Sequence, residues 1–274
     1  MSLILNSNSS VGIASQMVGR TTRQIEESTV TLATGLRINN AADDAAGLGV
    51  ATHLNARSIS GRVAMRNAND AVSMLQTTDG ATDEVVNLLT RIRELAVESA
   101  SDTLASTERA YADAEVLELR AEIVRIAEET EFNDFQLTDG SVTQLAVQVG
   151  VNNRSADRID IGFIDLTTTS LGVVDINVAT IADAQKAITL ADRALDNINS
   201  ERSQLGAYIN RAESAYDTIQ TYVETTTSAA SKIQDADFAF ETATLTANQI
   251  LQQSAVSVLS QAKSMNESAI QLIG

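Results

Sequence analysis

The sequence lacks proline, cysteine and tryptophan, and phenylalanine and tyrosine supply only 3% of its 274 residues. Without proline, no ring removes a helical hydrogen bond or clashes with the preceding turn, so very long helices are permitted. Without cysteine, disulfides, thiolate metal sites and cysteine nucleophiles are excluded. Because large aromatic anchors are scarce, we expect helices to pack through narrow seams of small and aliphatic residues.

Basic residues are also few, with 19 Lys and Arg against 36 Asp and Glu, a formal charge of -17 and a pI near 4.3. This balance disfavours nucleic acid, whose binding depends on basic contacts to phosphate. His53 is the only histidine, so neither a catalytic triad nor a multi-histidine metal site has enough residues. We therefore predict no enzyme, no metal and no cofactor.

Two long stretches near the ends of this acidic chain carry no charged side chain: residues 1–19 and 242–262. Eleven of the twenty-one residues at 242–262 are Thr, Ser, Asn or Gln, which would each need a partner in hydrocarbon, so we predict no membrane span. The first residues lack the basic segment and apolar block of a secretory signal peptide.

Heptad spacing marks three interior helices. From Ile181 to Ile233, apolar residues alternate three and four apart, and only Arg202 and Thr226 interrupt them. This pattern predicts one long coiled-coil helix. A second helix is predicted from about Ala45 and a third from about Ser106. Their expected stripes are Ala71, Met74, Thr78, Ala81, Val85, Leu88, Ile92, Leu95 and Ser99 in the second, and Ala110, Ala114, Leu117, Ala121 and Val124 in the third.

The pattern changes to alternation in "QLAVQVG" (144–150) and "DRIDIGF" (157–163), which flank the turn-like "VNNRSA". We expect a small β-hairpin patch around 135–180, with a turn at Asp139-Gly140. The predicted fold class is therefore mainly α: a long antiparallel coiled-coil rod with a small β-hairpin patch, and terminal helices that form a coiled coil on polymerisation.

The ends carry a heptad pattern of smaller residues, and isolated helices with such narrow seams are marginal in water. We predict that the two ends pair with each other and with other copies of the chain. The predicted seam consists of Val11, Ala14, Val18, Ile25, Leu32, Leu251, Ala255, Val258, Ala262, Met265, Ala269 and Leu272. Amides predicted to hydrogen-bond inside the assembly are Gln249, Gln252, Gln253 and Gln261.

A connector, "TGLRINNAADDAAGLGVA" (34–51), follows the N-terminal seam. Gly35 can end the first helix in a left-handed conformation, and Asp43 or Asp44 can cap the next one. Capping is the expected role of this acidic pair, in preference to an acid–base dyad.

Six motifs in this order resemble bacterial flagellin over essentially the whole chain. They are "LATGLRINNAADDAAGLGVA" (32–51), "RNANDAVSMLQTTDGA" (66–81), "RIRELAVESAS" (91–101), "EFNDFQL" (131–137), "QVGVNN" (148–153) and "NQILQQSAVSVLSQA" (248–262). Larger flagellins insert variable outer domains after the hairpin region. Here only a short segment lies between residues 165 and 181, so the chain resembles a minimal flagellin without those domains.

The resemblance implies a structural subunit that polymerises into the extracellular flagellar filament of swimming bacteria, exported without a cleaved signal peptide. It implies an N-terminal inner-core helix at 1–34, a spoke at 35–44 and a C-terminal inner-core helix at 234–274. The outer tube would consist of helices and a hairpin at 45–180 and a long rod helix at 181–233. The spoke residues are Gly35, Arg37, Asn39, Asp43 and Asp44. Implied partners are further copies, an export chaperone, the filament cap and hook–filament junction proteins.

The resemblance also implies a surface for the vertebrate innate-immune receptor for flagellin, at Arg91, Leu95 and Glu115. In the alternative interpretation, Arg91 and Glu94 make ordinary subunit contacts and Leu95 belongs to a helix seam. Two other classes of protein stay open: a hook–filament junction protein, which shares the terminal helices, and a secreted amphipathic protein that acts on membranes. The second usually needs basic polar faces and large apolar anchors, which these ends lack.

Overall fold

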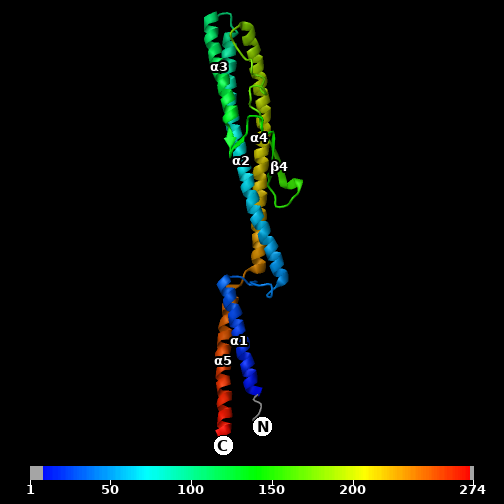
Figure 1. The fold of residues 1–274 in the computed structure, drawn as a ribbon, viewed down its shortest axis with the longest axis vertical. Helices are drawn as coiled ribbons and strands as arrows, with labels where there is room; N and C mark the ends of the chain where they lie inside the picture. The colour runs from blue at the N-terminus through cyan, green and yellow to red at the C-terminus, as the bar shows by residue number, and fades with distance from the viewer. Residues whose placement is uncertain (1–8, 272–274) are drawn as a thin grey trace. The chain divides into compact units, whose positions relative to one another are not determined.

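The computed structural model describes residues 9–271, apart from the side chains of Ser10 and residues 266–271. Its helices are α1 (Ser9–Thr34), α2 (Ala45–Ser99), α3 (Ser106–Glu129), α4 (Ile181–Gln234) and α5 (Phe238–Gln271) (Figure 1). Two compact units are present: one combines the chain up to Ala56 with the chain from Thr225 onward, and the other is 57–224. The mainly α fold is confirmed, and α2, α3 and α4 begin at the residues that the sequence predicted.

In the second unit, α2 and α4 run antiparallel. Arg93 Nε donates a hydrogen bond to Asp192 Oδ1 at 2.6 Å near one end of the pair. Near the other end the helices approach closely, since a Cβ on Gly61 would lie 2.5 Å from Cγ2 of Val223. All nine residues of the stripe predicted on α2 are buried or half-buried, which confirms that register.

Arg202 interrupts the apolar heptads of α4 and forms a bridge to α2. Its Nε lies 3.0 Å from Asp79 Oδ1, and its Nη1 lies 3.0 Å from Asp83 Oδ1. The hydrogen bond with Asp79 is the main reason that the pKa of Arg202 is raised. A charged residue therefore keeps the heptad position because two carboxylates of the facing helix pair with it.

The stripe predicted on α3 was wrong. Ala110, Ala114 and Ala121 are exposed, Leu117 is 42% exposed and Val124 is half-buried, whereas Val116 and Ile123 are fully buried. Alanines occur on more than one face of this helix, so spacing alone did not distinguish the stripes. The face with the β-branched and larger side chains is the buried one because it removes more apolar area from water.

The predicted hairpin is confirmed. Strands β3 (Gln144–Gln148) and β4 (Arg158–Gly162) pair antiparallel, with Ala146 opposite Asp160. A second small hairpin joins β1 (Glu131–Phe132) to β2 (Phe135–Gln136). Its turn residues, Asn133 and Asp134, have φ of 51° and 66°, as a two-residue turn of type I′ requires.

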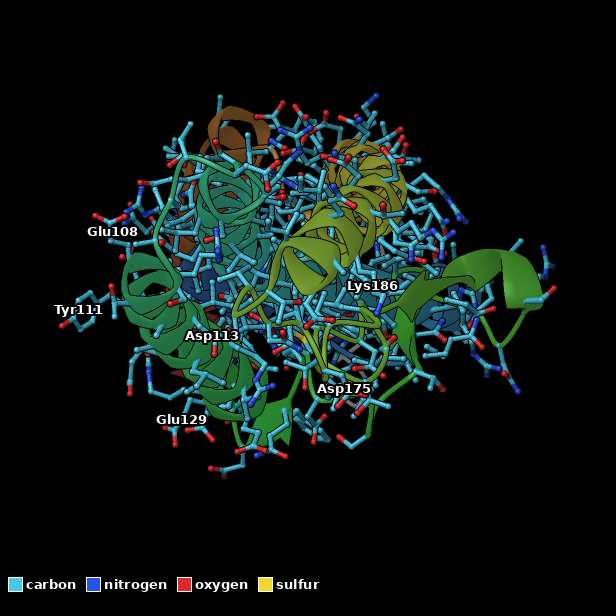
Figure 2. All side chains as sticks on the ribbon, turned by 90° about the horizontal axis from the view of Figure 1, so that it is seen from above. Glu108, Tyr111, Asp113, Glu129, Asp175 and Lys186 are labelled. Atoms are coloured by element: carbon cyan, nitrogen blue, oxygen red, sulfur yellow. The ribbon has the colours of Figure 1, made fainter. Side chains whose placement is uncertain are left out.

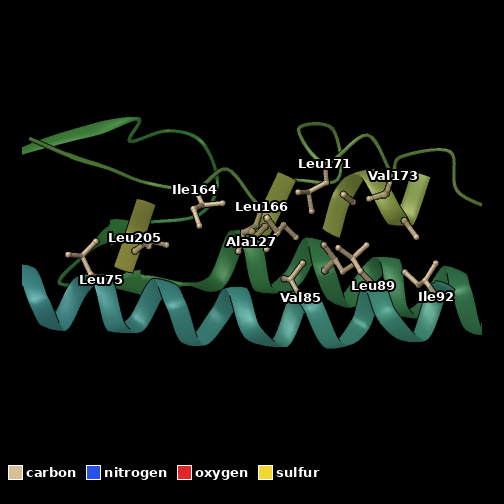
Figure 3. Packing of buried hydrophobic residues seen from close by; sticks show 14 of the residues in the cluster. Leu75, Val85, Leu89, Ile92, Ala127, Ile164, Leu166, Leu171, Val173 and Leu205 are labelled. Carbon is tan, nitrogen blue, oxygen red and sulfur yellow. The ribbon is translucent and has the colours of Figure 1, made fainter. Parts of the chain in front are cut away.

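The segment between β4 and α4 packs into the core of the second unit, which the sequence did not predict. Leu166, Val173 and Val178 are fully buried there. Helix α3 holds the segment: Asp113 Oδ1 accepts the N–H of Val178 at 2.8 Å, and Arg120 donates to the carbonyl of Val174. Figure 3 shows side chains from this segment, α2, α3 and α4 meeting in one core.

Candidate assembly site

The first unit is built around the pairing of α1 with α5, which lie side by side (Figure 1). The helices run antiparallel, because the end of α1 and the start of α5 meet where Ala236 N–H donates to the Gly35 carbonyl at 3.0 Å. On α1 the predicted positions are confirmed as the face toward α5: Ala14 is buried, and Val11, Val18, Ile25 and Leu32 are half-buried. Thr21 and Ser28 continue the same stripe and are buried.

The register predicted on α5 was wrong for the contact with α1. Ala255 and Ala262 are half-buried as expected, but Leu251 is 55%, Val258 54% and Met265 74% exposed. The stripe that faces α1 instead consists of Asn248, Gln252, Ala255, Leu259 and Ala262. Two heptad registers share Ala255 and Ala262, and the charge-free sequence supplied no polar face to choose between them. The side chain of Ala269, and Leu272 as a whole, lie outside the described part of the chain.

Only one of the four predicted amides lies in this seam. Gln252 is half-buried, and its Nε2 donates to Thr22 Oγ1 at 2.9 Å, which links α5 to α1 directly. Gln249, Gln253 and Gln261 are exposed on the remaining faces of α5. Asn248, buried at 7% exposure, is a seam residue that the sequence analysis missed.

The α1–α5 pair leaves large apolar side chains exposed. We call them the outer apolar face: Ile13, Met17 and Val30 of α1, and Phe238, Phe240, Ile250, Leu251, Val256, Val258 and Met265 of α5. Each is between 48% and 74% exposed. Large apolar surfaces of this kind mark interaction sites on soluble proteins. Two features of the sequence indicate this face. Residues 242–262 carry no charge, and they contain more apolar residues than a single heptad stripe can hold.

The predicted spoke connects α1 to α2 through a set of specific hydrogen bonds. Gly35 has φ of +73°, and its N–H donates to the Thr31 carbonyl at 2.9 Å, so it ends α1 as expected. Arg37 fastens the connector to the end of α4: its backbone N–H donates to Gln234 O at 2.7 Å, and its Nη2 to Ile233 O at 2.6 Å. The side chain of Asn39 donates to Leu36 O at 2.8 Å.

The adjacent acids of the spoke have separate roles. Asp44 caps α2, since its Oδ1 accepts the N–H of Gly47 at 2.8 Å. Asp43 Oδ2 accepts the N–H groups of Asn39 and Asn40, each at 2.9 Å. The bond from Asn40, followed by that from Asn39, lowers the pKa of Asp43 below its usual value of 3.8. Both carboxylates are therefore engaged with backbone, which confirms capping for Asp44.

Asp43 gives the spoke a predictable pH response. Because its pKa is lowered in the folded chain, its contribution to stability is present above pH 3.8 and is lost as pH falls through the lowered value. We expect Asp43→Ala to raise hydrogen exchange at the Asn39 and Asn40 amides roughly three- to tenfold at neutral pH. Acidification of the unmodified chain through the lowered pKa of Asp43 should cause the same loss of protection, after correction for the intrinsic pH dependence of amide exchange.

The matched control is Asp44→Ala, which should raise exchange at Gly47 and leave Asn39 and Asn40 protected. If Asp43→Ala left both amides as protected as in the unmodified chain, the assignment of these two hydrogen bonds would be wrong.

Two of the three residues predicted to form the receptor surface are exposed, and the third is buried. Arg91 Nε lies 2.8 Å from Glu115 Oε1, and Arg91 Nη1 lies 3.1 Å from Glu94 Oε2. The bond with Glu115, then that with Glu94, raises the pKa of Arg91. Leu95 is only 3% exposed, so its assignment to a receptor surface was wrong, and the alternative interpretation of Leu95 as a seam residue is confirmed.

Within residues 9–271 no group of His, Asp and Glu side chains is arranged to hold a metal ion. His53 is exposed on α2. None of the described helices combines the length and hydropathy that crossing a membrane requires. The features that stand out are thus helix seams, the spoke and the outer apolar face.

Comparison with known proteins agrees with these features. Residues 5–143 match the bacterial flagellin N-terminal helical region, and residues 188–273 match the bacterial flagellin C-terminal helical region. A flagellin of Halalkalibacterium halodurans is 34% identical over 271 residues, which cover 99% of this chain and 100% of that protein. The flagellar filament 33 kDa core protein of Treponema phagedenis is 33% identical, with 99% and 100% coverage.

Among solved structures, Bacillus cereus flagellin aligns with a TM-score of 0.51 and 33% identity, covering 56% of this chain and 88% of that one. Both family regions are therefore present in order, and the similarity extends over nearly the full length. The chain belongs to the bacterial flagellin family, in a minimal form without variable outer domains.

Proposed function

We propose that this chain is the repeating subunit of a bacterial flagellar filament, outside the cell. The observation that carries the proposal is the outer apolar face on the paired terminal helices, together with similarity over the whole chain to proteins named flagellin and filament core protein. We propose that other copies of the chain bury that face in the filament. Burying one Leu, Val, Ile or Phe contributes about 1.5–3 kcal/mol, so several such residues per subunit can offset the entropy lost on association.

The proposed layout follows the predicted segments. The terminal segments, 1–34 and 234–274, form the inner core of the filament, and 35–44 forms the spoke. Residues 45–180 and 181–233 form the outer tube. The exposed Gln249, Gln253 and Gln261 then serve as hydrogen-bonding groups between chains, because amides cross an interface without the desolvation cost of full charges.

The same face accounts for one of the other proposed partners, the export chaperone. An exposed apolar surface is an aggregation hazard before assembly, so an export chaperone that covers α5 is the expected companion inside the cell. Filament cap and hook–filament junction proteins are proposed to contact the ends of the polymer. Arg91 and Glu115 remain the candidate contacts for the vertebrate innate-immune flagellin receptor. The alternative function, a hook–filament junction protein, is disfavoured by the names of the full-length relatives at 33–34% identity.

Helices α1 and α5 are proposed to become fully ordered only on polymerisation. The buried positions of the α1–α5 seam are Ala, Thr, Ser and Asn, whereas its Val, Ile and Leu side chains are only half-buried, so a single pair contributes little apolar burial. Limited trypsin digestion of dilute monomer should cut first at Arg20, Arg23 and Lys263, all exposed, and leave the middle of the chain intact. In the polymer the same sites should resist digestion. Equal protection of these sites in dilute monomer would contradict the proposal.

A further inference from the structure

A groove lies in the second unit between the loop that joins β3 to β4 and the facing surface of α4. We call it the hairpin groove; its volume is about 600 Å³, in the range that accepts a small ligand or a few side chains. Its floor is apolar, with Val149, Ile159 and Ile219 buried beneath the opening. Arg57 of α2, Arg158 of β4 and Arg211 of α4 line it, against a single carboxylate, Asp157.

A site lined by three arginines and one carboxylate is unusual in a chain with 36 acids and 19 bases. Arg57 Nη2 donates to Asn152 Oδ1 at 3.1 Å, and its guanidinium lies 5.8 Å from the Tyr222 ring centroid. Arg158 donates to the amide oxygens of Gln148 and Asn153, at 3.1 and 2.6 Å. None of the three arginines is among the ion pairs of the described residues, so the groove is a positive site on an acidic protein.

The outward face of α3 has the opposite character. Its exposed stripe consists of Ala110, Ala114, Leu117 and Ala121, with Tyr111 beside it at 78% exposure. Figure 2 shows Tyr111 pointing away from the other helices. Glu118 and Glu128 are exposed on the same helix and, like the groove arginines, are absent from the ion pairs of the described part of the chain.

We propose that the hairpin groove of one chain receives the outward face of α3 from a second copy. This inference rests on the proposed function. An apolar helix face with acidic flanks complements an apolar groove with a basic rim, and a helix in a groove is a recurring mode of recognition. The α3 of the same chain cannot be the occupant without unpacking, because Val116, Ile123 and Ala127 hold its other face in the core.

The geometry of such a contact suits a filament. The groove and the α3 face are different surfaces, and every copy carries both. A contact between two different surfaces is heterologous, so each chain can bind one copy on each side and the assembly extends without limit unless its rotation closes a ring. The proposed contact therefore supplies a head-to-tail interaction in the outer tube, in addition to the burial of the outer apolar face.

Charge reversal tests the pairing. We expect Arg211→Glu and Glu118→Arg each to lower the fraction of chain that sediments as polymer at least tenfold, and the double variant R211E/E118R to recover most of it. The matched controls are Arg193→Glu on α4 and Glu98→Arg on α2, which are exposed, lie outside both surfaces and should polymerise normally. Circular dichroism of each monomer should match the unmodified chain, since all four side chains are exposed.

Cross-linking tests the occupant directly, because the chain has no cysteine of its own. Leu117→Cys combined with Thr218→Cys, on α3 and at the groove, should give a ladder of disulfide-linked oligomers when the polymer is oxidised. Leu117→Cys combined with Ala207→Cys, on α4 outside the groove, should give no ladder above the monomer.

Three outcomes would overturn the inference in distinguishable ways. If the unmodified chain polymerises and Arg211→Glu polymerises equally well, this contact is wrong while the proposed function stands. If Arg211→Glu fails, but the double variant is not rescued and no ladder forms, the groove binds something other than α3. If the unmodified chain forms no polymer, the proposed function fails, and the contact fails with it.

Discussion

Replacing Val258 by Asp is expected to abolish polymerisation while leaving the free chain as helical as before. Val258 is 54% exposed and lies on the outer apolar face of α5, away from the stripe that contacts α1. In a monomer the new carboxylate stays in water and costs little. In the proposed inner core it would be buried without a partner, at a cost of several kcal/mol per subunit.

A penalty of about 4 kcal/mol corresponds to a roughly 10³-fold rise in the critical concentration for assembly. Sedimentation of the polymer over a range of chain concentrations measures this quantity. Val258→Thr is the matched control: it keeps the shape and replaces one methyl group by an uncharged hydroxyl, so its effect should be smaller than that of Asp. Assembly of Val258→Asp at the unmodified critical concentration would show that this face of α5 is not covered in the polymer.

Replacing Ile123 by Ala is expected to lower the free energy of unfolding of the second unit by about 2–5 kcal/mol, as deletion of a fully buried aliphatic side chain does. Ile123 has 0% exposure and belongs to the core that α2, α3 and α4 share. Urea unfolding of the monomer, followed by circular dichroism, measures the change.

Leu117→Ala is the control on the same helix, because Leu117 is 42% exposed. It should lower the free energy of unfolding of the monomer by less than about 1 kcal/mol. Leu→Ala and Ile→Ala each remove three carbon atoms, so the difference between the two variants reports burial. If the two variants lost similar stability, the buried face of α3 would include Leu117, as the heptad stripe first predicted from the sequence would have it.

Sequence patterns located the helices well wherever one face carried large side chains. On α4, Ile198, Leu205 and Ile219 fix the register by their buried area, and the structure confirms it. Arg202 also fits that pattern once its partners Asp79 and Asp83 are known, but they lie more than a hundred residues earlier in the chain. No local pattern could have supplied them.

Registers failed where small residues covered more than one face. On α3 and α5, alanines satisfy heptad spacing in more than one frame, and the correct frame depends on what the partner helix presents. For α5 the partner is α1, where Thr22 bonds Gln252 and thereby places Gln252, not Leu251, in the seam. The same ambiguity has a physical consequence: a helix with two usable faces can contact one partner within the chain and a second outside it.

Irregular segments were the least predictable part. The β3–β4 hairpin was found by alternation, whereas the packing of Leu166 and Val173 into the core has no periodic signal. The hairpin groove was also invisible from sequence, because it brings together Arg57, Arg158 and Arg211 from three distant segments. The spoke, by contrast, was predicted in outline because Gly35 and Asp44 act on their immediate neighbours.

Electron microscopy of the purified chain in negative stain, after salt-induced polymerisation, shows directly whether the chain is a filament subunit. A filament subunit should form long helical filaments of uniform diameter, and Val258→Asp under the same conditions should form none. Short caps, discrete rings or monomers from the unmodified chain would contradict the proposal that it is the repeating subunit of a filament, and short caps would favour the junction-protein alternative.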